Sequence, residues 1–211
     1  MRDEFERQLA LLNEELTTMG GLIESAIANA VKALDGDEHS INKAYDYEKS
    51  IDNKEREIES LSLKLLLTQQ PVASDLRLIS AALKMITDME RIGDQAEDIA
   101  EIAATAKKKM LKKSKHIQRM AAATIDMVNK SVEAFIKKDL LIEEVSHNDD
   151  VVDALFEEIV NDLVDIIKKD EGTSEVLDML MVAKYFERIG DHAVNIAEWV
   201  QFSITGEHKR L

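Results

Sequence analysis

Apolar residues recur at alternating spacings of three and four positions along most of the chain. The first run extends from Phe5 through Leu12 and Met19 to Leu34. This spacing places the apolar side chains on one stripe of an α-helix, within which Gly20-Gly21 predicts a bend. The same pattern predicts helices at about 40–67, 74–107, 114–137, 140–167 and from the 171–174 turn to about 203. The chain is therefore predicted to be all-α, with Ser74 as the N-cap of its third helix.

The third and sixth predicted helices contain a repeated segment. Residues 90–101 read ERIGDQAEDIAE and residues 187–198 read ERIGDHAVNIAE, with nine of the twelve positions identical. A repeat of this kind indicates that one supersecondary unit was duplicated. We predict two tandem, sequence-related three-helix bundles, built from six long antiparallel helices and spanning 1–109 and 114–206. The basic stretch from Lys107 to Lys115 is predicted to be the end of a helix and the connector between the bundles.

The composition fits this prediction and excludes several functions. One proline and seven glycines are too few for many short strands and turns. The net charge of −15 argues against duplex nucleic acid as a partner, because that affinity comes mainly from Lys and Arg. The absence of cysteine excludes disulfides, thiolate zinc sites and cysteine nucleophiles. There is no signal-peptide pattern and no apolar run of about 20 residues, so a cytoplasmic protein without membrane insertion is expected.

Acidic residues recur in both halves at spacings that place them on one face of a helix. In the repeat, the acidic stripe holds Glu90, Asp94, Glu97 and Glu101, and in the second copy Glu187, Asp191 and Glu198. The preceding helix of each half adds a pair four residues apart, Glu48/Asp52 and Asp149/Asp153. Antiparallel packing would bring these pairs face to face, where they could not all stay ionised without a countercharge. Hard oxygen ligands of this kind suit Mg²⁺, Mn²⁺, Ca²⁺ or iron.

Three alternatives remain at this point: a metal site, a solvated acidic face on a structural scaffold, and a carboxylate-bridged metalloenzyme such as a phosphohydrolase or oxidase. A ferritin-type di-iron centre needs two Glu-x-x-His pairs. The chain has one such spacing, Glu144/His147, without a counterpart in the first half. No phosphate-binding glycine loop or nucleophile elbow is present. Repetition of both acidic pairs favours the metal site, and we expect no catalytic activity.

These residues resemble the PhoU family of phosphate-uptake regulators over nearly the whole chain. The resemblance rests on the segment Gln70 to Arg77 (QPVASDLR), the two ERIGD segments and the acidic pairs. It implies two similar three-helix bundles that bind multinuclear metal clusters, with iron expected first and zinc, manganese or magnesium as alternatives. The implied metal ligands are Glu48, Asp52, Glu90, Asp94, Asp98, Asp149, Asp153, Glu187 and Asp191.

The resemblance also implies a regulatory role rather than a chemical one. Members of the family act between the ATPase subunit of the phosphate ABC transporter and the sensor histidine kinase of the phosphate response. They are negative regulators of uptake and of the starvation response. A homodimer or higher oligomer is expected, peripheral to the inner face of the membrane. Because Asn195 and Val194 replace Asp98 and Glu97 in the second copy, we predict two unequal metal sites.

Overall fold

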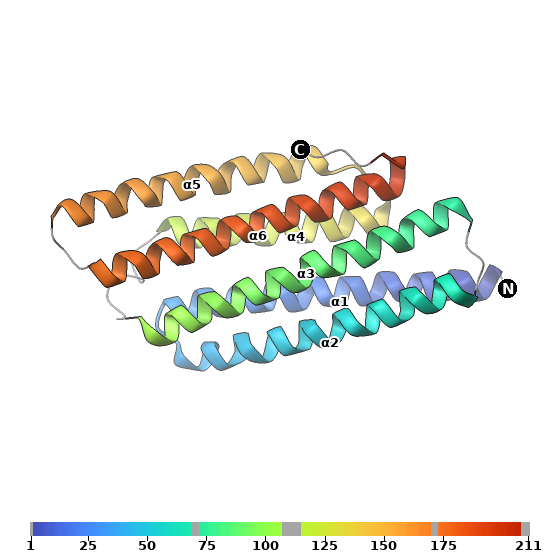
Figure 1. Ribbon diagram of the computed structural model, residues 1–211, viewed down its shortest axis with the longest axis horizontal. Coiled ribbons are helices and arrows are strands. Elements are labelled where there is room, and N and C mark those ends of the chain that lie inside the picture. The colour runs from blue at the N-terminus through green and yellow to red at the C-terminus, as the bar shows by residue number, and fades with distance from the viewer. Residues whose placement is uncertain (1, 69–71, 107–114, 170–172, 208–211) are drawn as a thin grey trace.

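The computed structural model describes residues 2–68, 72–106, 115–169 and 173–207, and these residues form six helices. Their bounds are α1 Arg2–Leu34, α2 Glu38–Thr68, α3 Ala73–Thr105, α4 Lys115–Lys137, α5 Ile142–Lys168 and α6 Thr173–Thr205 (Figure 1). The all-α class is therefore confirmed, and each helix begins and ends within a few residues of its predicted bounds. Most of the predicted basic connector, residues 107–114, lies outside the described residues, so the boundary between the two bundles stays a prediction.

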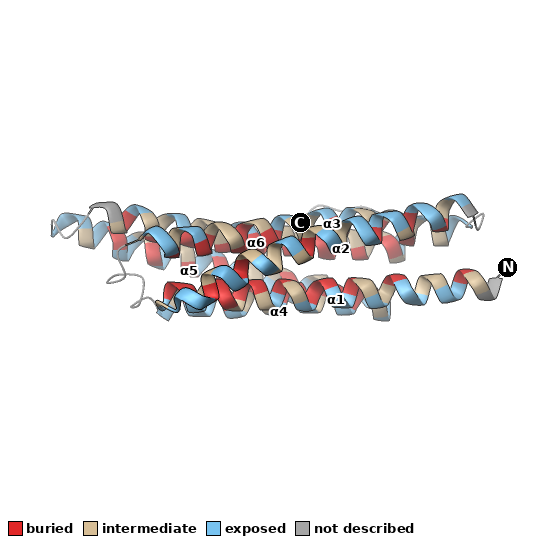
Figure 2. Ribbon diagram, turned by 90° about the horizontal axis from the view of Figure 1, so that it is seen from below, coloured by how far each residue is buried: buried red, intermediate tan, exposed pale blue. Residues whose placement is uncertain are grey.

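The third helices of the two halves lie side by side at the centre of the molecule. α3 and α6 run antiparallel there, with α2 flanking α3 and α5 flanking α6 (Figure 1). α1 and α4 contact each other and form a layer beneath α3 and α6 (Figure 2). Buried apolar residues from all six helices make one continuous cluster. The two bundles are thus packed against each other through a shared core, with α3 and α6 as its middle.

The predicted core stripes are buried. Ile92 and Ile99 of α3 and Ile189 and Ile196 of α6 have no exposed surface. Burial of side chains of this size contributes about 1.5–3 kcal/mol each. The acidic stripe of α3, and Glu187 and Asp191 of α6, therefore face away from the core, as the helical period requires.

Two local features of the helices differ from the predictions. α3 begins one residue before Ser74, and its N-cap position is Val72, which makes no side-chain cap hydrogen bond. α1 continues as one helix through Gly20-Gly21. After α1, Gly36 adopts a positive φ of 97° and its N–H donates to the Ala33 carbonyl at 2.8 Å. This left-handed glycine ends the helix in the usual way.

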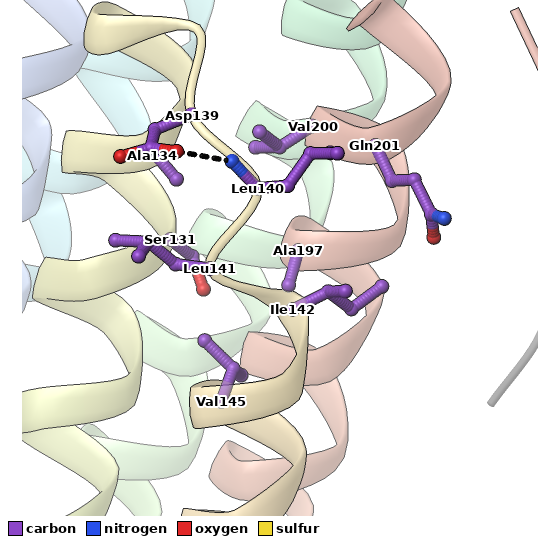
Figure 3. A pocket seen from close by; sticks show the side chains of 10 residues that line it. All are labelled: Ser131, Ala134, Asp139, Leu140, Leu141, Ile142, Val145, Ala197, Val200 and Gln201. Atoms are coloured by element: carbon purple, nitrogen blue, oxygen red, sulfur yellow. Dashed lines mark hydrogen bonds between the residues drawn. The ribbon is translucent and has the colours of Figure 1, made fainter. Parts of the chain in front are cut away.

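The connection between α4 and α5 packs directly against α6. In Figure 3, side chains of Leu140, Val145, Ala197 and Val200 line a recess, and the Leu140 N–H donates to Asp139 Oδ1 at 2.8 Å. The recess leaves no space for a water molecule, so it is part of the packing rather than a ligand site. Among the described residues, no helix is both long enough and apolar enough to cross a membrane.

Candidate functional site

The first acidic surface is formed where α2 and α3 pack side by side. It consists of carboxylates that interact electrostatically across the two antiparallel helices, namely Glu48, Asp52 and Glu55 of α2 and Glu90, Asp94 and Glu97 of α3. The two predicted pairs of the first half are therefore brought together.

Burial and neighbouring negative charge make these carboxylates harder to ionise. The pKa of Glu48 is raised by burial and by the charges of Glu97 and Asp52. The pKa of Glu90 is raised by burial and by Asp94, and that of Glu97 by burial and by Asp98. Mutual repulsion of this kind is relieved by a bound cation.

Two arginines supply part of the countercharge at the edge of the first acidic surface. Arg91 Nη1 lies 3.1 Å from Asp94 Oδ2, and its Nε lies 3.5 Å from Glu90 Oε2. Arg56 Nη2 donates to Asp52 Oδ2 at 3.0 Å. Both arginines are more than half exposed, so these ion pairs are weak in water. They orient the carboxylates without removing the negative potential between the helices.

The second acidic surface, formed by Asp149 and Asp153 of α5 and Glu187 and Asp191 of α6, repeats this arrangement. Burial raises the pKa of Asp149 to about 6, with further contributions from Asp153 and Asp191. The pKa values of Asp153 and Asp191 are raised by burial first and by Glu187 second. The duplicated sequence thus produces two acidic surfaces with the same origin.

Each copy of the repeat has a glycine at the centre of its acidic surface, where a side chain of the neighbouring helix lies close. A Cβ atom on Gly93 would lie 3.0 Å from Ile51 Cδ1, and one on Gly190 would lie 2.9 Å from Asp149 Oδ1. A side chain of α2 or α5 therefore lies close to the backbone of α3 or α6 at each glycine. At Gly190 that neighbour is itself one of the predicted ligands.

The two surfaces differ in charge, and the structure adds two differences to those visible in the repeat. Lys184 Nζ lies 2.5 Å from Glu187 Oε2, whereas Thr87 occupies the equivalent position in the first half. Phe156 lies on α5 near Lys184, where the first half has Glu55. At these two positions the second surface has one carboxylate fewer and one cation more, whereas Asp150 and Glu157 stand where the first surface has Lys49 and Arg56.

Asp98 lies at the edge of the first surface and also contacts the second half. Burial raises its pKa, while a hydrogen bond from the Tyr185 hydroxyl lowers it. At the equivalent contact, Asp88 Oδ1 lies 2.9 Å from His192 Nδ1 and accepts a hydrogen bond from Asn195 at 3.1 Å. Sequence reasoning did not find these contacts between α3 and α6, because they join residues more than 100 positions apart.

Other acidic residues have different surroundings from those predicted. Glu198 is only 6% exposed, so it belongs to the packing of α6 and not to an open stripe. Glu144 of the Glu-x-x-His spacing is exposed and pairs with Lys130 at 3.3 Å. Gln70 and Pro71 of the QPVASDLR motif lie outside the described residues.

The carboxylate donors suit hard cations, but the structure contains no ready-made chelate. In the part of the chain that is described, no three Asp, Glu or His side chains are grouped closely enough to hold an ion. The carboxylates lie in rows along two helices, and Arg91 pairs with Asp94 at the edge of the first row. Metal binding at the nine predicted ligands therefore stays a prediction, supported by the type and charge of the donors.

Comparison with known proteins agrees with the duplicated architecture. A profile of the PhoU domain matches residues 16–103 and 117–200. A Clostridium acetobutylicum protein named phosphate-specific transport system accessory protein PhoU homolog is 36% identical, covering 100% of this chain and 98% of its own. A Pseudomonas aeruginosa protein of the same name is 32% identical, and the match covers 98% of this chain and 88% of that protein.

Two solved structures have the same fold. The crystal structure of PhoU from Pseudomonas aeruginosa superposes with a TM-score of 0.85 at 31% identity, over 96% of this chain and all of that one. The phosphate transport system regulatory protein PhoU from Streptococcus pneumoniae gives a TM-score of 0.90 at 22% identity, over 98% of this chain and all of that one. With the matching profile and the close relatives, these findings confirm the predicted resemblance, and the chain belongs to the PhoU family.

Proposed function

We propose that this protein is a metal-binding regulatory adaptor of phosphate transport. The observation that carries the proposal is the occurrence of two acidic surfaces at equivalent positions of the two halves, each with carboxylates whose pKa values are raised. Such surfaces cost stability in the absence of a cation. Relatives named as accessory proteins of the phosphate-specific transport system support the same role.

In this proposal the metal ions supply countercharge and organise the acidic surfaces for a partner. The first surface would hold them through Glu48, Asp52, Glu90 and Asp94, with Asp98 at its edge, and iron is the expected metal. The partners are the ATPase subunit of the phosphate ABC transporter and the sensor histidine kinase, and the protein acts as a homodimer or higher oligomer at the inner face of the membrane. It lowers uptake and the starvation response when phosphate is abundant.

Elemental analysis tests the proposal directly. Protein purified without added metal or an affinity histidine tag is compared with an Asp94→Asn/Asp191→Asn variant, before and after reconstitution with iron, manganese and zinc. Several equivalents per chain, lost in the variant while helicity by circular dichroism is retained, are expected. Absence of bound metal in both proteins after reconstitution would contradict it. Turnover of phosphate esters by the loaded protein would instead favour the carboxylate-bridged enzyme.

A further inference from the structure

A cavity of about 390 Å³, lined by both charged and apolar residues, lies between the two halves, where α3 begins and α6 ends. Its charged lining residues are Arg77, Lys138, Glu6 and Asp75. The volume lies within the range of small-molecule sites. We propose that this cavity binds inorganic phosphate in a form that keeps a hydroxyl group. The inference goes beyond the proposed function, because it uses none of the residues of the acidic surfaces and needs no metal.

Arg77 is the first reason to expect an anion. Its Nε atom is buried and has no hydrogen-bond partner, and in the described part of the chain its guanidinium makes no ion pair. Gly206, with a φ of 80°, lies against the side chain, since a Cβ there would be 3.6 Å from Arg77 Cδ and Nε. A buried donor without a partner costs free energy and calls for an explanation. A tetrahedral oxyanion matches the planar donors of a guanidinium.

Lys138 is the second cation, and its backbone is strained. Its φ of 55° makes it the one residue other than glycine with a positive φ among those described. It follows the last residue of α4, a position that usually holds glycine or asparagine. In the described structure its ammonium group has no carboxylate partner. The lysine at this strained position is explained if its charge is used in the cavity.

The acidic lining residues define which anion fits. Glu6 and Asp75 balance the formal charges of Arg77 and Lys138, so a fully deprotonated anion gains little from the site as a whole. An ionised carboxylate can only accept hydrogen bonds. Inorganic phosphate at neutral pH keeps at least one hydroxyl that can donate to such a carboxylate, whereas sulfate has none. The charge pattern of the cavity therefore favours inorganic phosphate over sulfate and over a phosphate monoester dianion.

The start of α3 itself contributes little to anion binding. Val72 provides no side-chain cap, but Asp75 in the first turn offsets the positive end of the helix dipole. Glu90 of the first acidic surface lies 13 residues after Arg77 on α3, which corresponds to about 20 Å of helix. Binding in the cavity can therefore be measured separately from binding at the acidic surfaces.

The test is calorimetric titration of the full chain with inorganic phosphate, before and after treatment with a chelator. We expect saturable binding of one phosphate per chain that survives removal of metal, with sulfate and phosphoserine about tenfold weaker or more. Arg77→Gln and Lys138→Asn should each weaken phosphate binding about tenfold or more. Asn tolerates the left-handed conformation, so Lys138→Asn should fold. Lys137→Gln is the matched control, because Lys137 pairs with Glu133 and does not line the cavity.

Other results would contradict the assignment of the cavity as a phosphate site. Lack of phosphate binding to the metal-free protein, or unchanged affinity in folded Lys138→Asn, would overturn the assignment. Phosphate binding that disappears with the metal would place the anion at the acidic surfaces, and equally tight binding of phosphoserine would exclude selection for a hydroxyl. Asp75→Asn should narrow the difference between phosphate and sulfate, and an unchanged difference would refute the role of that carboxylate. Apart from metal-dependent phosphate binding, these results do not bear on whether the acidic surfaces bind metal.

Discussion

Asp149→Asn should stabilise the metal-free protein at neutral pH while removing metal from the second acidic surface. Burial and the charges of Asp153 and Asp191 raise the pKa of Asp149 from 3.8 to about 6. In the unfolded chain this carboxyl ionises near pH 4, but in the folded chain it does so near pH 6. The ionisation of Asp149 therefore lowers the free energy of unfolding as the pH rises from about 4 to about 6, and the loss persists at higher pH. The full shift corresponds to about 3 kcal/mol, and partial exposure to solvent reduces the expected effect to about 1–2 kcal/mol.

The assay is urea unfolding in the presence of a chelator at pH 4 and pH 7.5. Asp149→Asn should raise the free energy of unfolding at pH 7.5 and leave it nearly unchanged at pH 4, where the native carboxyl is already protonated. Asp162→Asn, at an exposed position of the same helix, controls for the loss of one negative charge. A loss of stability at pH 7.5, or an equal gain at both pH values, would refute the reasoning. A residue that costs stability and is required for binding is typical of a functional site.

Three further predictions concern packing and charge. Gly93→Ala should lower the free energy of unfolding by about 1–3 kcal/mol, because the new Cβ would crowd the buried side chain of Ile51. Gly21→Ala is the control: its Cβ meets nothing within 4 Å, so it should raise the free energy of unfolding by about 0.5–1 kcal/mol. Urea unfolding of both variants measures the difference. Lys184→Met should tighten metal binding at the second surface up to about fivefold, measured by metal titration, since Glu187 loses a competing cation. Asn195→Asp should cost about 1–3 kcal/mol in unfolding assays, and Asp88→Asn in the same chain should restore it.

Local patterns in the sequence were sufficient to predict the helices and the pairing of the acidic residues. Ile92 and Ile189 are buried and their acidic neighbours face outward because both follow from the helical period. The pairing of α2 with α3 and of α5 with α6 follows from short antiparallel connections. These features depend on residues that are close in the chain, and a repeated segment reports each of them twice.

Features that depend on packing between the halves could not be predicted. The contact of His192 with Asp88 joins residues 104 positions apart, and the Arg77 cavity draws its lining from α1, α3, α6 and the residue after α4. No periodicity in one helix reports such a contact. Burial of Glu198 was missed for a related reason, because the apolar stripe of α6 is wider than that of a helix buried on one side only.

The contacts between α3 and α6 also explain why the two acidic surfaces are unequal. In the repeat, position 98 corresponds to 195 and position 88 to 185, so the two contacts are equivalent. The carboxylate comes from opposite ends of the two contacts: Asp98 accepts from the Tyr185 hydroxyl, whereas Asp88 accepts from the Asn195 amide. Each contact thus joins one carboxylate to a neutral donor, since two carboxylates at hydrogen-bonding distance would repel. A neutral residue at position 195 is therefore required by Asp88. The asymmetry of the surfaces follows from how the halves pack, so Asn195 does not by itself indicate that the second half has lost the ability to bind metal.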